Sequence, residues 1–248
     1  MEAIDISSTM WGKNFMIPMY LFFGGLTAGL GDVAVVADLL EGRYKSCNTL
    51  SKLAIYAALP AWALGSFFVI YHLGRPLRGM LFPLYFSNYG SWMTYGGWAM
   101  GMGGPFIVVY GLLRHFDLYP LWRRVIGLIS IPFMFWMALN TAMLLSAATR
   151  VPIWSRDYLP ALFINSGLLS GVAGAGLLFI LAARYFPFGA VREGVPHQVL
   201  LGTSVGALAF EVIEVGILYS LVNFLAAGAA SPVVGAVSSA KGSPIFYD

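Results

Sequence analysis

Three carboxylates lie inside long apolar stretches of this sequence, where an ionised group is unfavourable unless it is paired or has a function. Glu211 and Glu214 share one stretch at an i, i+3 spacing, which places both on one face of a helix. Asp32 stands in another stretch. Ionisable groups at membrane depth are costly and mark proton routes or charge compensation for a bound redox molecule. These three are therefore candidates for a proton path; the alternative is that neighbouring helices satisfy them or that desolvation keeps them protonated.

Polar side chains also fall toward one end of the apolar stretches and offer the chemistry of a quinone site. A quinone headgroup needs a hydrogen-bond donor at each carbonyl, an apolar slot for its tail and a route for protons. Lys13, His72 and Asn140 belong to this polar set. Each of them alone is more often a helix cap or an interhelical hydrogen bond, so the indication comes from the set.

The few histidines and the single cysteine limit the metal chemistry of this protein. His115 falls in a predicted loop, while His72 and His197 fall at the ends of apolar stretches. No pair of axial ligands can be assembled inside the helices, so no haem is expected. Cys47 is the only cysteine, which excludes an internal disulfide and a Cys-ligated iron–sulfur cluster or structural zinc site built by this chain alone. We expect no haem or metal in this chain.

The composition indicates that these residues are positioned by membrane helices. Of 248 residues, 59% are hydrophobic and only 10% are charged, whereas soluble domains carry about 25% charged residues. A spanning helix needs about 20 mostly apolar residues. Six segments meet this requirement: 14–40, 50–73, 91–113, 121–148, 159–183 and 198–227. The sequence therefore predicts an all-α integral membrane protein with about six transmembrane helices.

Two connections, at 72–88 and 150–160, are more than turns, because both mix arginine with aromatic residues and proline. Such segments are expected to form ordered structure at the membrane interface and to dock a partner protein, although their arginines can equally reach lipid phosphates. The candidate docking residues are Arg75, Arg78, Arg150, Trp154 and Arg156. Basic residues are somewhat more numerous in the other connections, which predicts an N-terminus on the non-cytoplasmic side.

The stretch GLTAG at 25–29 is echoed by GLLSG at 167–171. If the fifth helix restarts the pattern of the first, the protein contains a four-helix bundle and part of a second bundle. The alternative is that small-xxx-small patterns recur in membrane helices because they pack well. The predicted organisation is a membrane domain over 1–227, with a four-helix bundle at 11–149 and a partial second bundle at 158–227, and a C-terminal tail over 228–248.

Three motifs in order carry a family resemblance. They are YLFFGGLTAG (20–29), HLGRPLR (72–78) followed by SNYGSW (87–92), and LLSAATRVPIWSRDYLPALFINSGLLSG (144–171). Together they resemble the NrfD/polysulfide reductase membrane-subunit family, from about Trp11 to Tyr247. The resemblance implies a fold of two four-helix bundles. It also implies a haem-free subunit of a prokaryotic inner membrane that exchanges electrons between a quinone, often menaquinone, and an extramembrane iron–sulfur protein. That protein commonly contacts a molybdenum or tungsten oxidoreductase or a multihaem cytochrome.

The sequence departs from the family pattern in two places. Family members usually continue for two or more helices beyond the segment that matches 242–247, so we expect either a shortened variant or a second membrane subunit that completes the bundle. The fourth helix of the family often reads Tyr-Thr-Gly at a position associated with the quinone, where this protein has Asn140, Thr141 and Ala142. Asn140 can hydrogen-bond a carbonyl but cannot copy a phenol.

The sequence therefore predicts a quinone-interacting membrane anchor of a respiratory oxidoreductase complex, which is not catalytic by itself. Lys13, His72 and Asn140 are expected to contact the headgroup. Two alternatives stay open: a proton- or ion-translocating module without a quinone site, and a purely structural anchor.

Overall fold

The computed structural model describes residues 15–44, 46–72, 89–146, 156–185 and 197–229. All regular structure in these ranges is helical. The helices are α2 (Met16–Leu40), α3 (Ser46–His72), α6 (Trp92–His115), α7 (Pro120–Ser146), α8 (Leu159–Tyr185) and α9 (His197–Ala229). All 6 are long and apolar enough to cross a membrane. The prediction of an all-α protein with about six transmembrane helices is confirmed.

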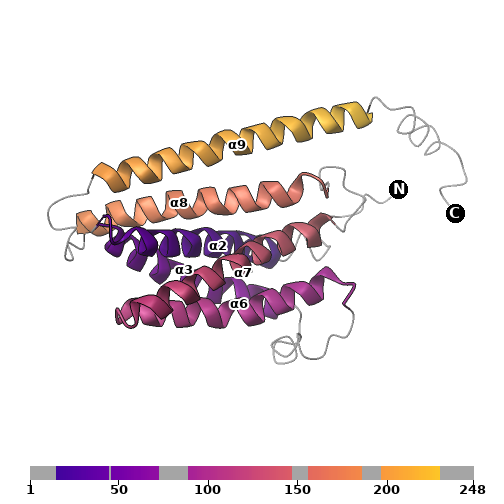
Figure 1. Cartoon of the computed structure of the whole chain (residues 1–248). Helices are drawn as coiled ribbons and strands as arrows, with labels where there is room; N and C mark the ends of the chain where they lie inside the picture. The colour runs from indigo at the N-terminus through magenta and orange to yellow at the C-terminus, as the bar shows by residue number, and fades with distance from the viewer. Residues whose placement is uncertain (1–14, 45, 73–88, 147–155, 186–196, 230–248) are drawn as a thin grey trace, which may run out of the picture.

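The helices lie side by side as an antiparallel bundle, with α2 near its centre (Figure 1). Helix α2 packs against α3, α7 and α8, whereas α9 packs mainly along α8 at one edge. The N-terminal ends of α2, α6 and α8 therefore share one end of the bundle, which we call the Met16 end. The opposite end, which we call the Leu40 end, holds the turn between α6 and α7.

Helix α3 begins at Ser46, four residues before its predicted apolar stretch, because the polar residues there bond within the protein. The side-chain and main-chain oxygens of Asn48 both accept from Arg114, each at 3.0 Å.

At the Leu40 end, Asp117 and Tyr119 adopt positive φ angles of 51° and 43° in the turn between α6 and α7. Asp tolerates this left-handed conformation better than most residues. The tight turn keeps α6 and α7 antiparallel and directs Asp117 toward both helices.

Helices α2 and α8 approach each other closely through glycines. A Cβ atom on Gly29 would overlap the carbonyl oxygen of Gly167, and one on Gly171 would overlap the Gly29 backbone. The two small-residue stretches singled out in the sequence thus pack against each other, as such stretches do in membranes. This packing is sufficient to explain why small residues occur in both stretches. The internal repeat and the division into bundles at 11–149 and 158–227 stay predictions.

Candidate functional site

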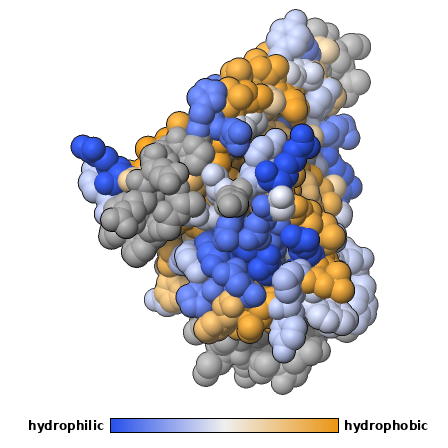
Figure 2. Space-filling model, turned by 60° about the vertical axis from the view of Figure 1, so that its left-hand side comes forward, coloured by the Kyte–Doolittle hydropathy of each residue, from blue (hydrophilic) through white to orange (hydrophobic). Residues whose placement is uncertain are grey.

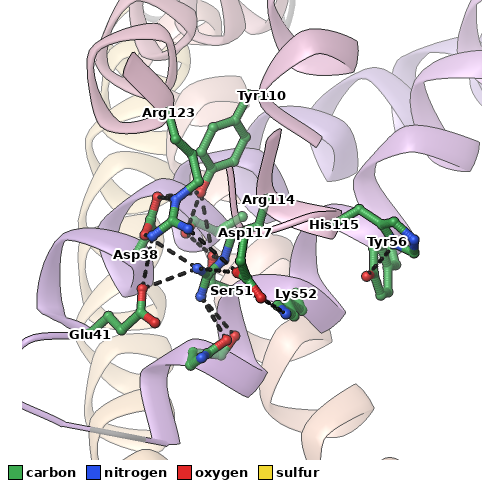
Figure 3. Close-up of polar contacts among 12 residues, drawn as sticks. Asp38, Glu41, Ser51, Lys52, Tyr56, Tyr110, Arg114, His115, Asp117 and Arg123 are labelled. Carbon is green, nitrogen blue, oxygen red and sulfur yellow. Dashed lines mark hydrogen bonds and ion pairs between the residues drawn. The ribbon is translucent and has the colours of Figure 1, made fainter. Parts of the chain in front are cut away.

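A group of ionised side chains closes the Leu40 end of the bundle (Figure 3). We call it the charge cluster, and it consists of Asp38, Glu41, Arg114, Asp117 and Arg123. Figure 2, which brings this end forward, shows a hydrophilic patch bordered by hydrophobic surface. The cluster takes residues from α2, α6, α7 and two adjoining turns, so it ties α2 to the α6–α7 hairpin, which is distant from it in sequence.

Arg123 holds the deepest acid of the charge cluster. Its Nη2 and Nε atoms donate to the two oxygens of Asp38, at 2.6 and 2.9 Å. Asp38 is fully buried and Arg123 is 4% exposed. Paired hydrogen bonds between a guanidinium and a carboxylate are among the strongest polar contacts in proteins. The contact fixes α7 against α2.

Arg114 is the largest fully buried side chain of the described residues. Its Nη1 lies 3.0 Å from Glu41 and 3.5 Å from Asp38, and its Nε donates to the Ser51 hydroxyl at 3.0 Å. The Tyr110 hydroxyl, one turn away on α6, donates to the carbonyl of Ala34 at 3.0 Å. The cluster therefore continues into the bundle as a hydrogen-bonded network, in which Arg114 directs its donors to partners from α2 and α3.

Sequence reasoning did not find the charge cluster. Arg114 and Arg123 are among the basic residues at the connections that were used only to predict orientation, and Asp38 was not among the candidate site residues. The available signal was spacing: Asp38 and Glu41 stand at i, i+3 at the end of one apolar segment, and the two arginines flank one short turn. Asp117 in that turn is a third carboxylate. Three carboxylates and two arginines at the same end of the helices can form an ion-pair network.

The carboxylates of the charge cluster are already paired with arginines, which favours a structural role over ligand binding. In the part of the protein that the structure describes, no three His, Cys, Asp or Glu side chains are grouped to hold a metal ion. His115 lies beside the cluster and shares a 2.8 Å hydrogen bond between its Nδ1 and the hydroxyl of Tyr56. The cluster is therefore a structural clamp on the Leu40 end.

Asn140 lies in the opposite half of the bundle and has unused hydrogen-bonding capacity. Its side chain is fully buried, and neither the amide oxygen nor the amide nitrogen has a hydrogen-bond partner among the described residues. Gly96 of α6 lies against it so closely that a Cβ atom there would overlap the amide. Buried polar groups are nearly always hydrogen-bonded, so an unpaired amide indicates a site for a polar ligand or water.

Tyr20 of α2 faces Asn140 and adds a phenol to the same region. Its side chain is 8% exposed. The phenol lies within weak hydrogen-bonding reach of the Asn140 side chain, but short of the geometry of a full hydrogen bond. Sequence reasoning missed Tyr20, although it begins the motif at 20–29 that carries the family resemblance. An amide and a phenol that face each other across a helix interface can each bond one oxygen of a small polar ligand.

Asp32 lies between these two regions and is also unpaired. It is 7% exposed, and both carboxylate oxygens are buried with no hydrogen-bond partner in the described ranges. It stands six residues before Asp38 on α2, about 9 Å at 1.5 Å per residue. A buried carboxyl without a donor is a high-energy feature that a protonated state, water or a mobile proton relieves.

The structure places Glu211 and Glu214, both on α9, apart from Asn140 and Tyr20. Glu214 is half-buried against α8, where its Oε2 lies 3.4 Å from the Asn165 amide nitrogen. It lines a groove of about 220 Å³ between α2 and α8, together with Ser166 and Ser170. Glu211 is exposed on the outer side of α9. The bundle therefore brings Asn140 together with Tyr20, but it does not bring either glutamate to them.

The other predicted site residues are placed only in part. Arg156 is exposed in the turn that precedes α8. His72 is the last residue of α3, at the Met16 end of the bundle. Lys13, Arg75, Arg78, Arg150 and Trp154 lie outside the described residues. The quinone contacts proposed for Lys13 and His72 and the docking role of the arginines remain predictions.

Comparison with known proteins gives one consistent result. The family described as "Polysulphide reductase, NrfD" matches residues 4–239. The C subunit of polysulfide reductase from Wolinella succinogenes is 26% identical, over 96% of this protein and 81% of the relative. A protein NrfD homolog of Haemophilus influenzae is 25% identical, over 69% of this protein and 60% of the relative. No solved structure matches. This multi-pass membrane protein, which has six membrane-spanning helices among its described residues, belongs to the NrfD polysulphide reductase family.

Proposed function

We propose that this protein is the quinone-interacting membrane anchor of a respiratory oxidoreductase complex. The observation that carries the proposal is the buried, unpaired amide of Asn140 facing the phenol of Tyr20. Both side chains lie near the Met16 end, where α2, α6 and α7 meet. Family membership makes this protein similar to membrane subunits of reductases with several subunits, such as the one named as the C subunit of polysulfide reductase.

The two donors fit one carbonyl of a quinone headgroup. Asn140 offers an amide N–H and Tyr20 a phenolic O–H, and the surrounding helices are apolar. His72, at the end of α3 on the same end of the bundle, is the proposed partner for the second carbonyl. Lys13, which lies outside the described residues, is the remaining proposed contact. The protein then supplies position, hydrogen bonds and exclusion of water, while the quinone, proposed to be menaquinone, supplies the redox chemistry.

The partner in this proposal is an extramembrane iron–sulfur subunit at the Met16 end. The connections at 73–88 and 147–155 join helices at that end, and exposed Arg156 adds a positive charge beside them. The iron–sulfur subunit is proposed to connect with a molybdenum or tungsten subunit or a multihaem cytochrome. The proposed location is the inner membrane of a prokaryote, with the N-terminus on the non-cytoplasmic side.

Replacing Asn140 with leucine tests the quinone site. We expect Asn140→Leu to lower quinol-linked kcat/KM of the assembled complex about tenfold, since one ligand hydrogen bond contributes about 1.4 kcal/mol. The matched control is Ser130→Ala on the same helix, because that buried hydroxyl bonds only the carbonyl of Gly127 in the other half of α7. His72→Ala is measured alongside. Wild-type turnover in both Asn140→Leu and His72→Ala would contradict the quinone site.

A second candidate function is proton translocation through the bundle, favoured by the unpaired carboxyl of Asp32. In that case Asp32→Asn abolishes proton flux in proteoliposomes that contain the complex, because an amide cannot carry the proton. A pH-sensitive dye reports the flux, and Ser130→Ala, which removes a hydroxyl bonded to the carbonyl of Gly127, is the control. Proton flux in Asp32→Asn equal to that of the wild type, together with electron flow that a quinone analogue blocks, would contradict proton translocation through Asp32. The quinone-interacting anchor would then be the remaining proposed function.

A further inference from the structure

The groove between α2 and α8, which α9 borders, holds polar side chains among apolar ones. Its volume is about 220 Å³, and its polar lining is Glu214, Ser166 and Ser170. We call it the serine groove. Its volume lies below the about 300–1,000 Å³ of pockets that enclose whole drug-sized ligands, so it fits one headgroup whose chain stays in the lipid. The apolar walls come from α2 and α8 and include Leu21, Phe22, Leu26, Leu162 and Phe163.

Ser166 and Ser170 keep free hydroxyls inside a helix. A serine in such a position commonly bonds a carbonyl one turn back, as Ser220 does to Gly216 at 2.9 Å. Neither Ser166 nor Ser170 takes part in a hydrogen bond between described residues. The two serines stand four residues apart, so they lie on one side of α8. Both hydroxyls are therefore available to a ligand in the serine groove.

Glu214 adds a hydrogen-bond acceptor with spare capacity. Its Oε2 accepts from the Asn165 amide only at 3.4 Å, because that amide donates more closely to the carbonyl of Phe210, at 2.8 Å. No other hydrogen bond or ion pair to Glu214 is found among the described residues. An ionised carboxylate has about four lone-pair sites and donates nothing, and at membrane depth it is costly unless it is paired. The serine groove thus presents an acceptor that lacks a matching donor.

The serine groove adjoins the proposed quinone site but differs from it in hydrogen-bonding character. Leu21, which lines the groove, directly follows Tyr20 on α2. Ser166 stands seven residues after the start of α8, and Asn140 stands six residues before the end of α7. Both therefore lie about 9–10 Å from the Met16 end, at 1.5 Å per residue. The amide and phenol of the quinone site donate to a carbonyl, whereas the carboxylate of the groove requires a ligand that brings its own O–H.

We propose that the serine groove binds the headgroup of the reduced carrier, a hydroquinone, and selects it against the oxidised quinone. One ring hydroxyl donates to Glu214, while Ser166 and Ser170 bond the ring oxygens. The oxidised ring has only carbonyl oxygens, which a carboxylate does not bond. The inference rests on the proposed function, because it takes the quinone carrier from there, but it assigns a second site with residues of its own. Selection by hydrogen bonding requires no redox step within the groove.

Photoaffinity labelling of the assembled complex tests the serine groove. The probe is a 1,4-naphthohydroquinone with a diazirine on its side chain next to the ring, used without oxygen, and the oxidised naphthoquinone is the paired probe. We expect the reduced probe to label residues 159–171 of α8 at least fivefold more than the oxidised probe does. Glu214→Leu should lower that labelling at least fivefold. Ser170→Phe, which fills the groove and keeps the carboxylate, should do the same.

Ser220→Ala is the control, because it removes a hydroxyl that bonds only its own helix, and it should label as the wild type does. Equal labelling by the two probes would overturn the proposal, as would wild-type labelling in both Glu214→Leu and Ser170→Phe. Labelling that excess unlabelled menaquinol leaves unchanged would show a groove filled by lipid and would also overturn it.

A separate outcome distinguishes the serine groove from the proposed quinone site. We expect Asn140→Leu to lower quinol-linked turnover and to leave the labelling of α8 by the reduced probe unchanged. If Asn140→Leu and His72→Ala both kept wild-type turnover while Glu214→Leu still abolished the labelling, the quinone site at Asn140 would be contradicted and the serine groove supported.

Discussion

Arg123→Met is expected to lower the free energy of unfolding by about 3–5 kcal/mol, because it breaks a buried ion pair and leaves one partner behind. Asp38 would lose the hydrogen bonds of 2.6 and 2.9 Å from Arg123 and keep only longer contacts to Arg114 and to the Tyr110 hydroxyl, each at 3.5 Å. A fully buried carboxylate without a close cation is strongly disfavoured. Glu41 would also lose its 2.9 Å contact. Unfolding of the detergent-solubilised protein, followed by tryptophan fluorescence, measures the change.

The matched control for Arg123→Met is Lys52→Met. Lys52 pairs with Asp117 at 2.5 Å, but the side chains are 28% and 47% exposed. Exposed pairs contribute about 0–1 kcal/mol, so this variant should remain near the wild type. Adding Asp38→Leu to Arg123→Met removes the uncompensated carboxylate and should recover part of the loss. If Arg123→Met and Lys52→Met proved equally stable, the charge cluster would not be the clamp described above.

Gly29→Ala is expected to destabilise the protein by about 3 kcal/mol, through steric overlap rather than charge. The added methyl group would overlap the carbonyl oxygen of Gly167 and come too close to the Cα of Gly171. Both are backbone atoms, so no side-chain rotation relieves the overlap, and α2 and α8 must move apart. The same unfolding measurement detects the loss, and quinol-linked turnover should fall with it because α2 also carries Tyr20.

Gly24→Ala on the same helix is the control for Gly29→Ala. A Cβ atom at Gly24 would meet nothing within 4 Å, and alanine favours a helix by about 1 kcal/mol over glycine. Gly24→Ala should therefore be neutral or slightly stabilising. A loss of stability in Gly24→Ala as large as in Gly29→Ala would mean that helix α2 tolerates no substitution, and that the close contact with α8 is not the reason.

The candidate site was partly accessible from sequence. Asn140 was identified because its polar side chain interrupts an apolar segment, at a position where the sequence departs from the Tyr-Thr-Gly often found in the family. Tyr20 was missed, since a tyrosine in a membrane helix gives no functional signal until a buried amide is found opposite it. Arg114 and Arg123 were assigned to loops because charge at a helix end normally faces water. Only the turn at Asp117, with its positive φ angle, brings both arginines over Asp38.

The sequence by itself determined the class of the protein and, to within four residues, the bounds of the long helices that the structure describes. Crossing a membrane requires a certain length of apolar residues, and that is a local property of about 20 consecutive positions. Tertiary structure decided which side chains meet, because that depends on the rotation of each helix about its axis and on its neighbours. Glu211 and Glu214 stand three residues apart, yet one packs against α8 while the other lies on the outer face of α9. No local pattern distinguishes those two outcomes until α8 is in place.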